Sequence, residues 1–239
     1  MYELRDEGER AVIYIYGTIG EGWTEEESNK AKNIAQELDA LGGKPVDVRI
    51  DSGGGDVYEG FAIASALLRY EGHVRAYVDG MAASAASYIA IMADEVVMAD
   101  FAWFMIHDAW CYTAGNAAQL LEDAARLEAL DATIAKMIAD RTGKDVDEVK
   151  AAMDAETWLD AEASLEFGLA DRIEETGKRM AACVDAALAS RYAHVPEAVE
   201  KVESHAVDTV ETDNGAPASK KTVLLGNRVW TIERSTDED

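Results

Sequence analysis

The chain has 239 residues, of which 49% are hydrophobic, and this suits one large domain or a domain of about 180 residues with a tail. Its net charge of −25 has the wrong sign for a phosphate backbone, so we expect no nucleic-acid partner. We expect no secretory signal at the N-terminus and no membrane helix, since no apolar run reaches roughly 18 residues, and the 2 cysteines imply no disulfide framework. These features favour a cytoplasmic protein that has no membrane partner.

The first half of the chain alternates short apolar segments with amphipathic ones. We expect strands at residues 11–15, 46–50 and 74–78, and helices that end near 41 or cover 57–70 and 82–92. Thr24 and Glu27 have the spacing of a capping box, which predicts that the first helix begins there. Gly80 is expected to end the third strand. The alternation of expected strands and helices predicts an α/β domain with a largely parallel sheet.

The second half begins with two short strands and then becomes helical. The expected strands are 95–98, 102–106 and 169–173, and the expected helices are 116–141, 147–153 and 161–167. The helix over 116–141 is longer than average, and an arm reaching into another subunit would cover its apolar stripe. We assign residues 1–175 to one domain and 176–239 to an acidic extension. In that extension 180–192 is expected to be helical, 207–221 a linker, 223–232 extended and the last residues disordered.

Ser84 is the preferred candidate for a nucleophile. It lies where a strand is expected to turn into a helix, among alanines that let other backbone approach closely. The start of a helix also supplies oriented N–H groups. Taken alone, such an Ala/Ser run more often marks only close packing. Ser87 is a rival hydroxyl on nearly the same face, and we expect it to lie deeper.

His107 is the candidate general base, because it ends an apolar strand beside the Gly/Ser-rich part of the core. Taken alone, a strand-end histidine is more often structural. Asp108 is adjacent, but neighbouring strand residues point to opposite faces, which makes it a poor partner for the imidazole. Cys111 is expected to be a buried or half-buried structural thiol. No His, Cys or carboxylate spacing predicts a metal site.

The three glycines at 53–55 follow the second expected strand. They lack the Lys-Ser/Thr ending of a P-loop and the spacing of a dinucleotide-binding loop, so no cofactor is expected. Two interpretations remain open, a flexible turn or a backbone N–H aimed at a developing oxyanion. A nucleophile, a base and backbone donors are the minimum parts for acyl transfer.

Four collinear motifs resemble the ClpP-type serine peptidases, the proteolytic subunits of Clp protease. The motifs are Ser52-Gly53-Gly54-Gly55, Gly80-Met81-Ala82-Ala83-Ser84, Met105-Ile106-His107 and the run from Trp158 to Asp171. The resemblance covers roughly residues 11–173. The short serine-to-histidine spacing, the Ala-Ala-Ser-Ala-Ala-Ser run and Glu-Thr-Trp look most like phage and prophage members, usually described as head-maturation or prohead proteases.

The resemblance implies an α/β fold of the ClpP/crotonase type, built from repeated ββα units with a long protruding helix. It also implies homo-oligomeric rings that interlock through that helix. Within the site it implies Ser84 as the nucleophile, His107 as the general base, and the N–H groups of Gly55 and Ala85 as the oxyanion hole.

The chain departs from the family pattern at two positions. The family places an aspartate two residues before the aromatic that corresponds to Trp158, and this chain has Glu156 there. A glutamate can still orient a histidine and stabilise its imidazolium form, and Asp154 is the competing carboxylate. Gly53 lies where the family usually has proline.

The function implied by the resemblance is a serine endopeptidase that cleaves protein or peptide substrates through an acyl-enzyme, ATP-independent or partner-assisted and without a cofactor. The implied setting is prohead maturation, with a scaffold or capsid protein as substrate and partner. One alternative is a catalytically silent ClpP-like ring or scaffold component, which Glu156 motivates. A crotonase-like acyl-CoA enzyme would leave the Ser–His pair without a role. A Ser–Lys dyad would need a lysine that is not evident near the site.

Overall fold

The computed structural model describes residues 2–6, 10–21, 28–175, 183–185, 192–196, 200–202, 220–225 and 228–233. The strands of its main sheet are β1 (Tyr2–Asp6), β2 (Ala11–Tyr16), β5 (Val46–Ser52), β6 (Val74–Ala83), β7 (Glu95–Ala99), β8 (Trp103–Ile106), β9 (Thr157–Leu159) and β10 (Arg172–Glu174). The helices are α1 (Ala31–Leu41), α2 (Val57–Arg69), α3 (Ala85–Ala90), α4 (Ala117–Thr142), α5 (Val146–Asp154) and α6 (Ala161–Phe167). Short pairs join β3 (Thr18–Ile19) to β4 (Ser28–Asn29), β11 (Cys183–Asp185) to β12 (Glu200–Val202), and β13 (Lys220–Leu225) to β14 (Arg228–Glu233).

The main sheet runs in the order β1-β2-β5-β6-β7-β10, and it divides at β6. The first part of β6 pairs in parallel with β7, through Arg75–Val78, whereas the last part pairs in parallel with β8, through Met81–Ala83. Strand β9 then adds antiparallel to β8. Apart from β9 and the antiparallel edge strand β1, the pairs of this sheet are parallel. The prediction of an α/β domain with a largely parallel sheet is confirmed.

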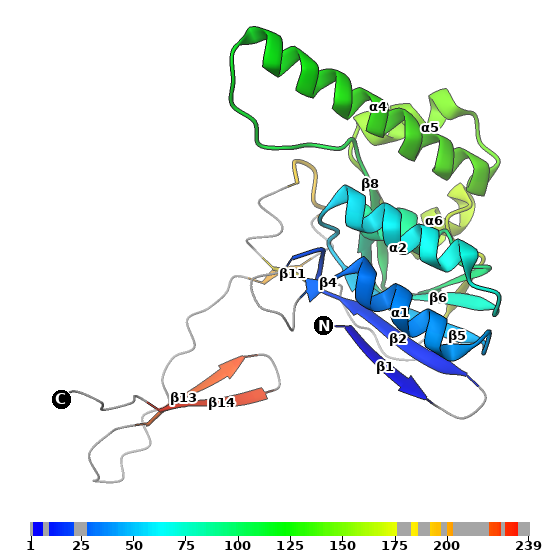
Figure 1. Ribbon diagram of the computed structural model, residues 1–239, viewed down its shortest axis with the longest axis vertical. Helices are drawn as coiled ribbons and strands as arrows, with labels where there is room; N and C mark the ends of the chain where they lie inside the picture. Colours follow the sequence, from blue (N-terminus) through cyan, green and yellow to red (C-terminus); the bar gives the residue numbers. More distant parts are fainter. Residues whose placement is uncertain are drawn as a thin grey trace.

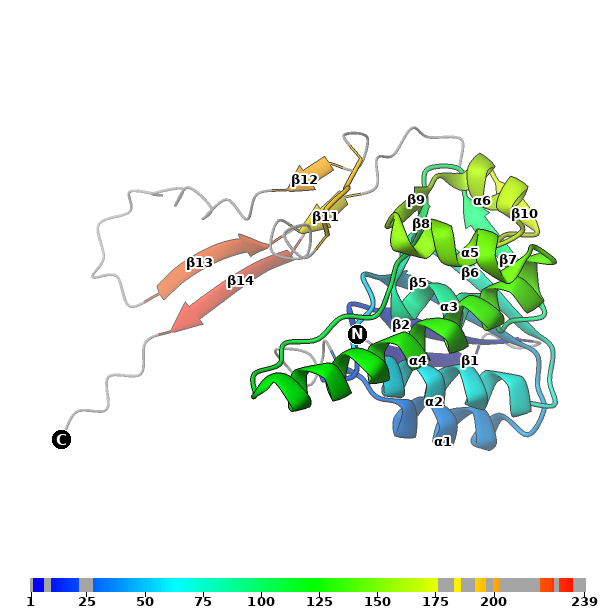
Figure 2. The ribbon, with the colours of Figure 1, turned by 90° about the horizontal axis from the view of Figure 1, so that it is seen from above.

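The core lies between this sheet and the helices that cover it. Helices α1 and α2 lie side by side over one face of the sheet (Figures 1 and 2). Alternate residues of β5, Val46, Val48 and Ile50, are fully buried, and α1 buries Ile34 and Leu38 against the same core. Burial of this apolar surface is the main stabilising contribution to such a fold.

The expectation that Gly80 ends a strand and that a helix covers 82–92 is wrong. Strand β6 continues through Gly80 to Ala83, and the following helix is only α3. Pairing with β8 extends the strand, and this tertiary contact overrides the helical preference of the alanines. Gly80 serves a different purpose, because a Cβ there would lie 2.7 Å from a carboxylate oxygen of Asp51.

The first helix begins later than expected. Ser28 and Asn29 form β4, and α1 starts only at Ala31, with Lys30 as its N-cap. Thr24 and Glu27 lie outside the described residues. The start of α1 is instead satisfied from outside the helix, because the Ala31 N–H donates to the Glu59 carboxylate of α2 at 2.6 Å.

Several bounds in the second half also differ from the expectations. The last strand of the domain is β10 rather than 169–173, and it pairs with β7. The expected helix over 180–192 is wrong where it can be compared, since residues 183–185 are strand β11. Most of the linker expected over 207–221 and the end of the chain lie outside the described residues. The extended conformation expected at 223–232 is confirmed for the described residues, which lie in the antiparallel strands β13 and β14.

Helix α4 agrees with the expected long helix and projects from the domain. Asn116 and Gln119 form a reciprocal capping box at its start, and Gly143 ends it in the left-handed conformation. Its buried residues all lie from 131 onwards, whereas Leu121 in the first half is 71% exposed. Figures 1 and 2 show this first half extending beyond α1 and α2. Among the described helices, none is both long and apolar enough to span a membrane.

The glycine loop after β5 packs against the turn that holds Ser84, and this leads to a prediction about stability. A Cβ at Gly54 would lie 2.7 Å from the Ser84 Cβ, whereas one at Gly43 would meet nothing within 4 Å. The φ angles are nearly equal, 86° at Gly54 and 85° at Gly43, so Gly43→Ala is a matched control for backbone strain. We expect about 1–2 kcal/mol of destabilisation from strain in both variants. Overpacking adds about 1–3 kcal/mol in Gly54→Ala.

Urea unfolding followed by tryptophan fluorescence measures both variants. A lower midpoint for Gly54→Ala than for Gly43→Ala is the expected result. Equal midpoints would show that the loop does not press on the Ser84 turn.

Candidate active site

Ser84 lies on a sharp turn between β6 and α3. Its φ of 54° and ψ of −122° place a non-glycine residue in a region that serine rarely adopts. The turn is held because the Ser84 N–H donates to the Met105 carbonyl at 2.9 Å. The alanines on either side are buried, and they leave room for the close approach of the glycine loop. A strained strand-to-helix turn of this kind presents a nucleophile clear of its own backbone.

His107 follows β8, and its Nε2 lies 2.8 Å from the Ser84 Oγ. The parallel pairing of β6 with β8, in which Ala83 is opposite Met105, carries the two residues to the same place. Burial lowers the pKa of His107 below its usual value, while the nearby carboxylates of Glu156 and Asp131 act in the opposite direction. The imidazole is therefore neutral at physiological pH and able to accept a proton from the serine.

This lowered pKa sets the expected pH dependence. Protonated His107 cannot act as a base, so we expect kcat/KM to fall on acidification, with a midpoint below the usual histidine value of 6.5. Glu156→Gln removes a charge that stabilises the imidazolium form, so the midpoint should move to still lower pH. A pH profile of kcat/KM measures both, and a midpoint above 6.5 in the wild type would contradict the burial of His107.

Two backbone N–H groups lie near Ser84, one in the glycine loop and one at the start of α3. Gly55 lies opposite Ile19 in an isolated parallel β-bridge, and the hydrogen bonds of this bridge are made by the residues on either side of Gly55. The Ile19 N–H donates to the Gly54 carbonyl, and the Asp56 N–H donates to the Ile19 carbonyl. Within the described part of the chain, the N–H of Gly55 itself has no hydrogen-bond partner. The N–H of Ala85, at the first turn of α3, is likewise without one among those residues.

The geometry explains why the loop requires glycine. A Cβ at Gly55 would lie 2.1 Å from the Ile19 carbonyl oxygen, and a Cβ at Gly54 would lie 2.9 Å from the Ala85 nitrogen. The loop backbone therefore reaches the start of α3, as a pair of oxyanion donors requires. Gly53, which replaces the family's proline, uses its carbonyl to accept a hydrogen bond from the Tyr192 hydroxyl.

A catalytic triad needs a carboxylate as its third member, beside the serine and the histidine. Glu156 and Asp154 are the two candidates, and they differ in their surroundings. Glu156 acts electrostatically on His107, but its carboxylate accepts hydrogen bonds from the N–H groups of Ala193, at 2.9 Å, and His194, at 2.7 Å. Burial alone would raise the pKa of Glu156, and these two N–H donors hold it below its usual value. Asp154 lies beside Lys150, at 3.4 Å. Among the described residues, His107 makes one side-chain hydrogen bond, to Ser84.

Two residues beside the site were not predicted from the sequence. Asp131 is a buried carboxylate on α4, only 6% exposed, and it accepts the Ala109 N–H at 2.7 Å just after His107. Its spacing from Ile134 and Ile138 places it on the buried stripe of the helix, so periodicity contained the signal. Tyr192 contacts the His107 ring, edge to face with centroids 5.6 Å apart, and nothing in the sequence predicted this contact.

The other residues that the sequence singled out differ in their burial and contacts. Ser87 is buried and donates its hydroxyl to the Ser84 carbonyl at 2.6 Å, which confirms that it lies deeper. Burial and the carboxylates of Asp131 and Asp154 raise the pKa of Asp108 to about 6. Cys111 is exposed, so the expectation of a buried or half-buried thiol is wrong. The described residues hold no group of three or more His, Cys, Asp or Glu side chains arranged for a metal ion.

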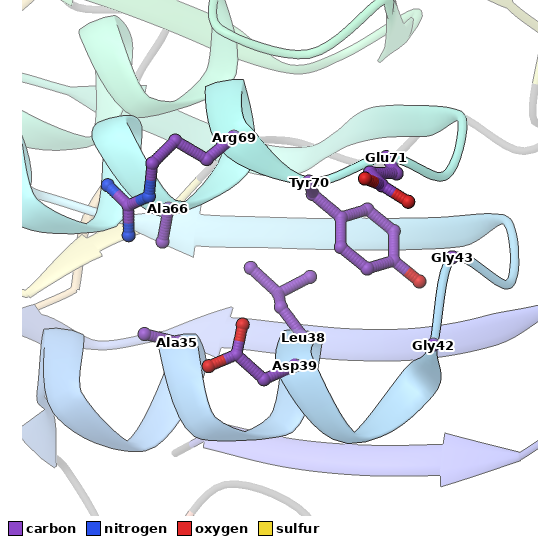
Figure 3. A pocket seen from close by; sticks show the side chains of 9 residues that line it. All are labelled: Ala35, Leu38, Asp39, Gly42, Gly43, Ala66, Arg69, Tyr70 and Glu71. Atoms are coloured by element: carbon purple, nitrogen blue, oxygen red, sulfur yellow. The ribbon is translucent and has the colours of Figure 1, made fainter.

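Two cavities differ in their relation to this site. One of about 10 Å³ adjoins Ser84 and His107, and its other lining residues are mostly apolar: Val57, Ser87, Tyr88, Ile106, Ala109, Ile134 and Ile138. A larger one of about 260 Å³ lies between α1 and α2, where Leu38, Arg69 and Tyr70 surround it (Figure 3). Of the two cavities, the small one is therefore the one that adjoins the Ser84–His107 pair.

Comparisons with known proteins agree with this architecture. A family model described as Clp protease matches residues 18–177. The chain is 34% identical over 137 residues to the ATP-dependent Clp protease proteolytic subunit 2 of Treponema denticola, covering 56% of this chain and 68% of that protein. It is 29% identical over 155 residues to the ATP-dependent Clp protease proteolytic subunit of Streptococcus gordonii, covering 62% of this chain and 79% of that protein.

A third relative shows how far the similarity extends. The chain is 26% identical over 136 residues to the ATP-dependent Clp protease proteolytic subunit 1 of Salinibacter ruber, covering 56% of this chain and 58% of that protein. This third relative is matched over less than two thirds of its own length. The sheet, the helices around it and the matched residues agree with the ClpP-type fold. The chain belongs to the Clp protease family.

Proposed function

We propose that this protein is a serine endopeptidase that hydrolyses peptide bonds through an acyl-enzyme. The observation that carries the proposal is the 2.8 Å approach of the His107 Nε2 to the Ser84 Oγ, on a turn whose backbone is strained. A nucleophile in hydrogen-bond contact with a neutral base is the pairing that acyl transfer requires.

In the proposed mechanism, His107 accepts the Ser84 proton as the Oγ attacks the scissile carbonyl. The N–H groups of Gly55 and Ala85 stabilise the oxyanion, since both are at the Ser84 turn and have no other partner among the described residues. His107 then gives its proton to the leaving amine, and the carbonyl carbon remains bound to Ser84. A water molecule, deprotonated by His107, then attacks the acyl carbon, and the bond to the Ser84 Oγ breaks as that oxygen takes the proton back from His107.

We assign Glu156 as the third member, acting by charge. Its carboxylate favours the imidazolium form of His107, which is the form that the transition state creates. Asp154 is a weaker candidate because it lies beside Lys150.

The substrate that we infer is an extended peptide with a small apolar side chain before the scissile bond. The cavity beside Ser84 and His107 has a volume of about 10 Å³ and is lined by Val57, Ile134 and Ile138 among others. A space of this size holds about one water molecule, so a large side chain would have to displace the lining.

Hydrolysis of a fluorogenic peptide library tests the proposal, with Ser84→Ala and Ser87→Ala compared in the same assay. We expect Ser84→Ala to lose about 10⁴- to 10⁶-fold in kcat. Ser87→Ala is the matched control, because that hydroxyl faces the Ser84 carbonyl rather than His107. Hydrolysis that survives in Ser84→Ala would contradict the assignment of the nucleophile.

We further propose that the chain works as a homo-oligomeric ring in prohead maturation, where it cleaves a scaffold or capsid protein. The exposed first half of α4, with Leu121 on its surface, supports assembly through that helix. The setting rests on the similarity of the serine and histidine motifs to phage and prophage members. Light scattering of the full chain and co-expression with a scaffold or capsid protein test the two parts.

A catalytically silent ring component is the second candidate. The observation that favours it is that neither Glu156 nor Asp154 donates or accepts a hydrogen bond with His107 in the described structure. Intact rings in which wild type and Ser84→Ala give the same trace of hydrolysis would support this candidate over the peptidase.

A further inference from the structure

A short segment of the C-terminal extension, Tyr192–Pro196, lies directly against the candidate active site. The Tyr192 ring meets the His107 ring edge to face, with centroids 5.6 Å apart, and meets Trp158 in the same way at 5.5 Å. Its hydroxyl donates to the carbonyl of Gly53. One tyrosine therefore contacts the base, the glycine loop and the β9 aromatic together.

The residues after Tyr192 continue the contact along the site. The N–H groups of Ala193 and His194 both donate to the Glu156 carboxylate, at 2.9 and 2.7 Å. Two backbone donors on one carboxylate form a charge-assisted contact, which is stronger than a hydrogen bond between neutral groups. The segment thus binds the same carboxylate whose charge acts on His107.

The apolar side chains of the segment cover a small cluster beside the site. Met81, Ala83 and Met105 form this cluster on β6 and β8, and Tyr192 and Val195 pack against it. The cluster flanks the strand end that carries Ser84. The site thus offers ring contacts, an acceptor for a hydroxyl group, a carboxylate for two backbone N–H groups, and apolar packing. Together these features fit an extended peptide that begins with tyrosine.

We propose that Gly53, His107, Trp158 and Glu156 form a subsite for tyrosine in an extended peptide, and that Tyr192 occupies it as an internal inhibitor. This inference rests on the proposed function, but the binding of the peptide can be measured without turnover. No carbonyl of the segment accepts a hydrogen bond from Gly55 or Ala85 among the described residues, so the segment blocks the site without presenting a bond for cleavage.

A peptide substrate with tyrosine at this position competes directly with the segment. Displacement of the segment removes two donors from Glu156, which leaves that carboxylate available to His107. The docked segment therefore limits the access of substrate, and it holds the Glu156 carboxylate in contacts other than one with His107.

Peptide binding tests the subsite independently of catalysis. A fluorescein-labelled peptide with the sequence Tyr-Ala-His-Val-Pro is titrated against full-length chains that all carry Ser84→Ala, and anisotropy gives the Kd. Adding the Tyr192→Ala substitution empties the subsite. We therefore expect the peptide to bind about tenfold more tightly than it binds the Ser84→Ala chain, because it no longer competes with a buried aromatic contact. Tyr112→Ala is the matched control, because Tyr112 is 93% exposed, and it should leave the Kd unchanged.

Two further comparisons make the test specific. The same peptide with alanine in place of tyrosine should bind the Tyr192→Ala chain about tenfold more weakly than the tyrosine peptide. In chains that retain Ser84, Tyr192→Ala should raise the rate of labelling by a fluorophosphonate about tenfold, and Tyr192→Phe should raise it less because the ring contacts remain.

Equal peptide affinity with and without Tyr192, or equal affinity for the tyrosine and alanine peptides, would overturn the inference. A failure of the proposed function gives a different result, in which no chain is labelled at Ser84 while the peptide affinities still differ.

Discussion

Replacing His107 with alanine is expected to lower kcat for peptide hydrolysis by about 10⁴- to 10⁶-fold. The Ser84 Oγ would lose the acceptor that lies 2.8 Å away, and no other side chain among the described residues makes a hydrogen bond with that hydroxyl. A serine hydroxyl without a base is a weak nucleophile at neutral pH. Steady-state kinetics on a fluorogenic peptide measures the loss.

His73→Ala is the control for this variant. His73 is exposed, at the end of the loop before β6, and its removal should leave kcat unchanged. Circular dichroism of both variants shows whether the sheet is retained. A His107→Ala chain that is folded and hydrolyses peptide within tenfold of the wild type would exclude His107 as the base.

Replacing Phe104 with alanine is expected to lower the free energy of unfolding by about 3–5 kcal/mol. Phe104 is fully buried on β8, opposite Ala82 of β6 and Leu159 of β9, so the removal of its ring leaves a cavity where the sheet divides. Small neighbours such as Ala82 cannot fill that space. Urea unfolding of the full chain measures the change.

Tyr58→Ala removes an aromatic side chain of similar size from the surface, where Tyr58 is 65% exposed, and should change stability by less than about 0.5 kcal/mol. A loss for Phe104→Ala as small as that of the control would mean that β8 is not packed between β6 and β9. Because His107 directly follows β8, the same result would also contradict the described position of His107.

Much of the fold was predictable from the sequence because its signals are local. The alternating apolar residues of β5 and the stripe of α4 specify a strand and a helix, and glycine or Asx residues mark their ends. Asp160 and Gly168 at the ends of α6 are examples, since the Asp160 carboxylate accepts the Ala163 N–H and Gly168 adopts a left-handed φ.

The elements that were mispredicted depend on partners distant in sequence. Strand β6 extends past Gly80 because β8 pairs with it, and α1 starts at Ala31 because Glu59 of another helix satisfies its N–H. Neither partner is visible in a local window of sequence. Propensity favoured a helix for the alanines at 82–86, and tertiary pairing decided otherwise for the first of them.

The candidate site was likewise predictable only in part. The approach of Ser84 to His107 was anticipated from spacing and from the resemblance, and the two side chains are in contact. The surroundings of Glu156 were not anticipated, because they depend on Ala193 and His194 in a segment that has no local signal. Asp131 was overlooked because an aspartate within a helix is usually solvated, although its spacing from Ile134 places it on the buried face.

The proposed mechanism requires that Ser84 is the residue that becomes acylated. Labelling the wild-type chain with a fluorophosphonate, followed by digestion and tandem mass spectrometry, locates the adduct. The adduct is predicted on the Oγ of Ser84, with no labelling of His107→Ala beyond background. An adduct on Ser87 or on any other residue, with Ser84 unmodified, would contradict the claim.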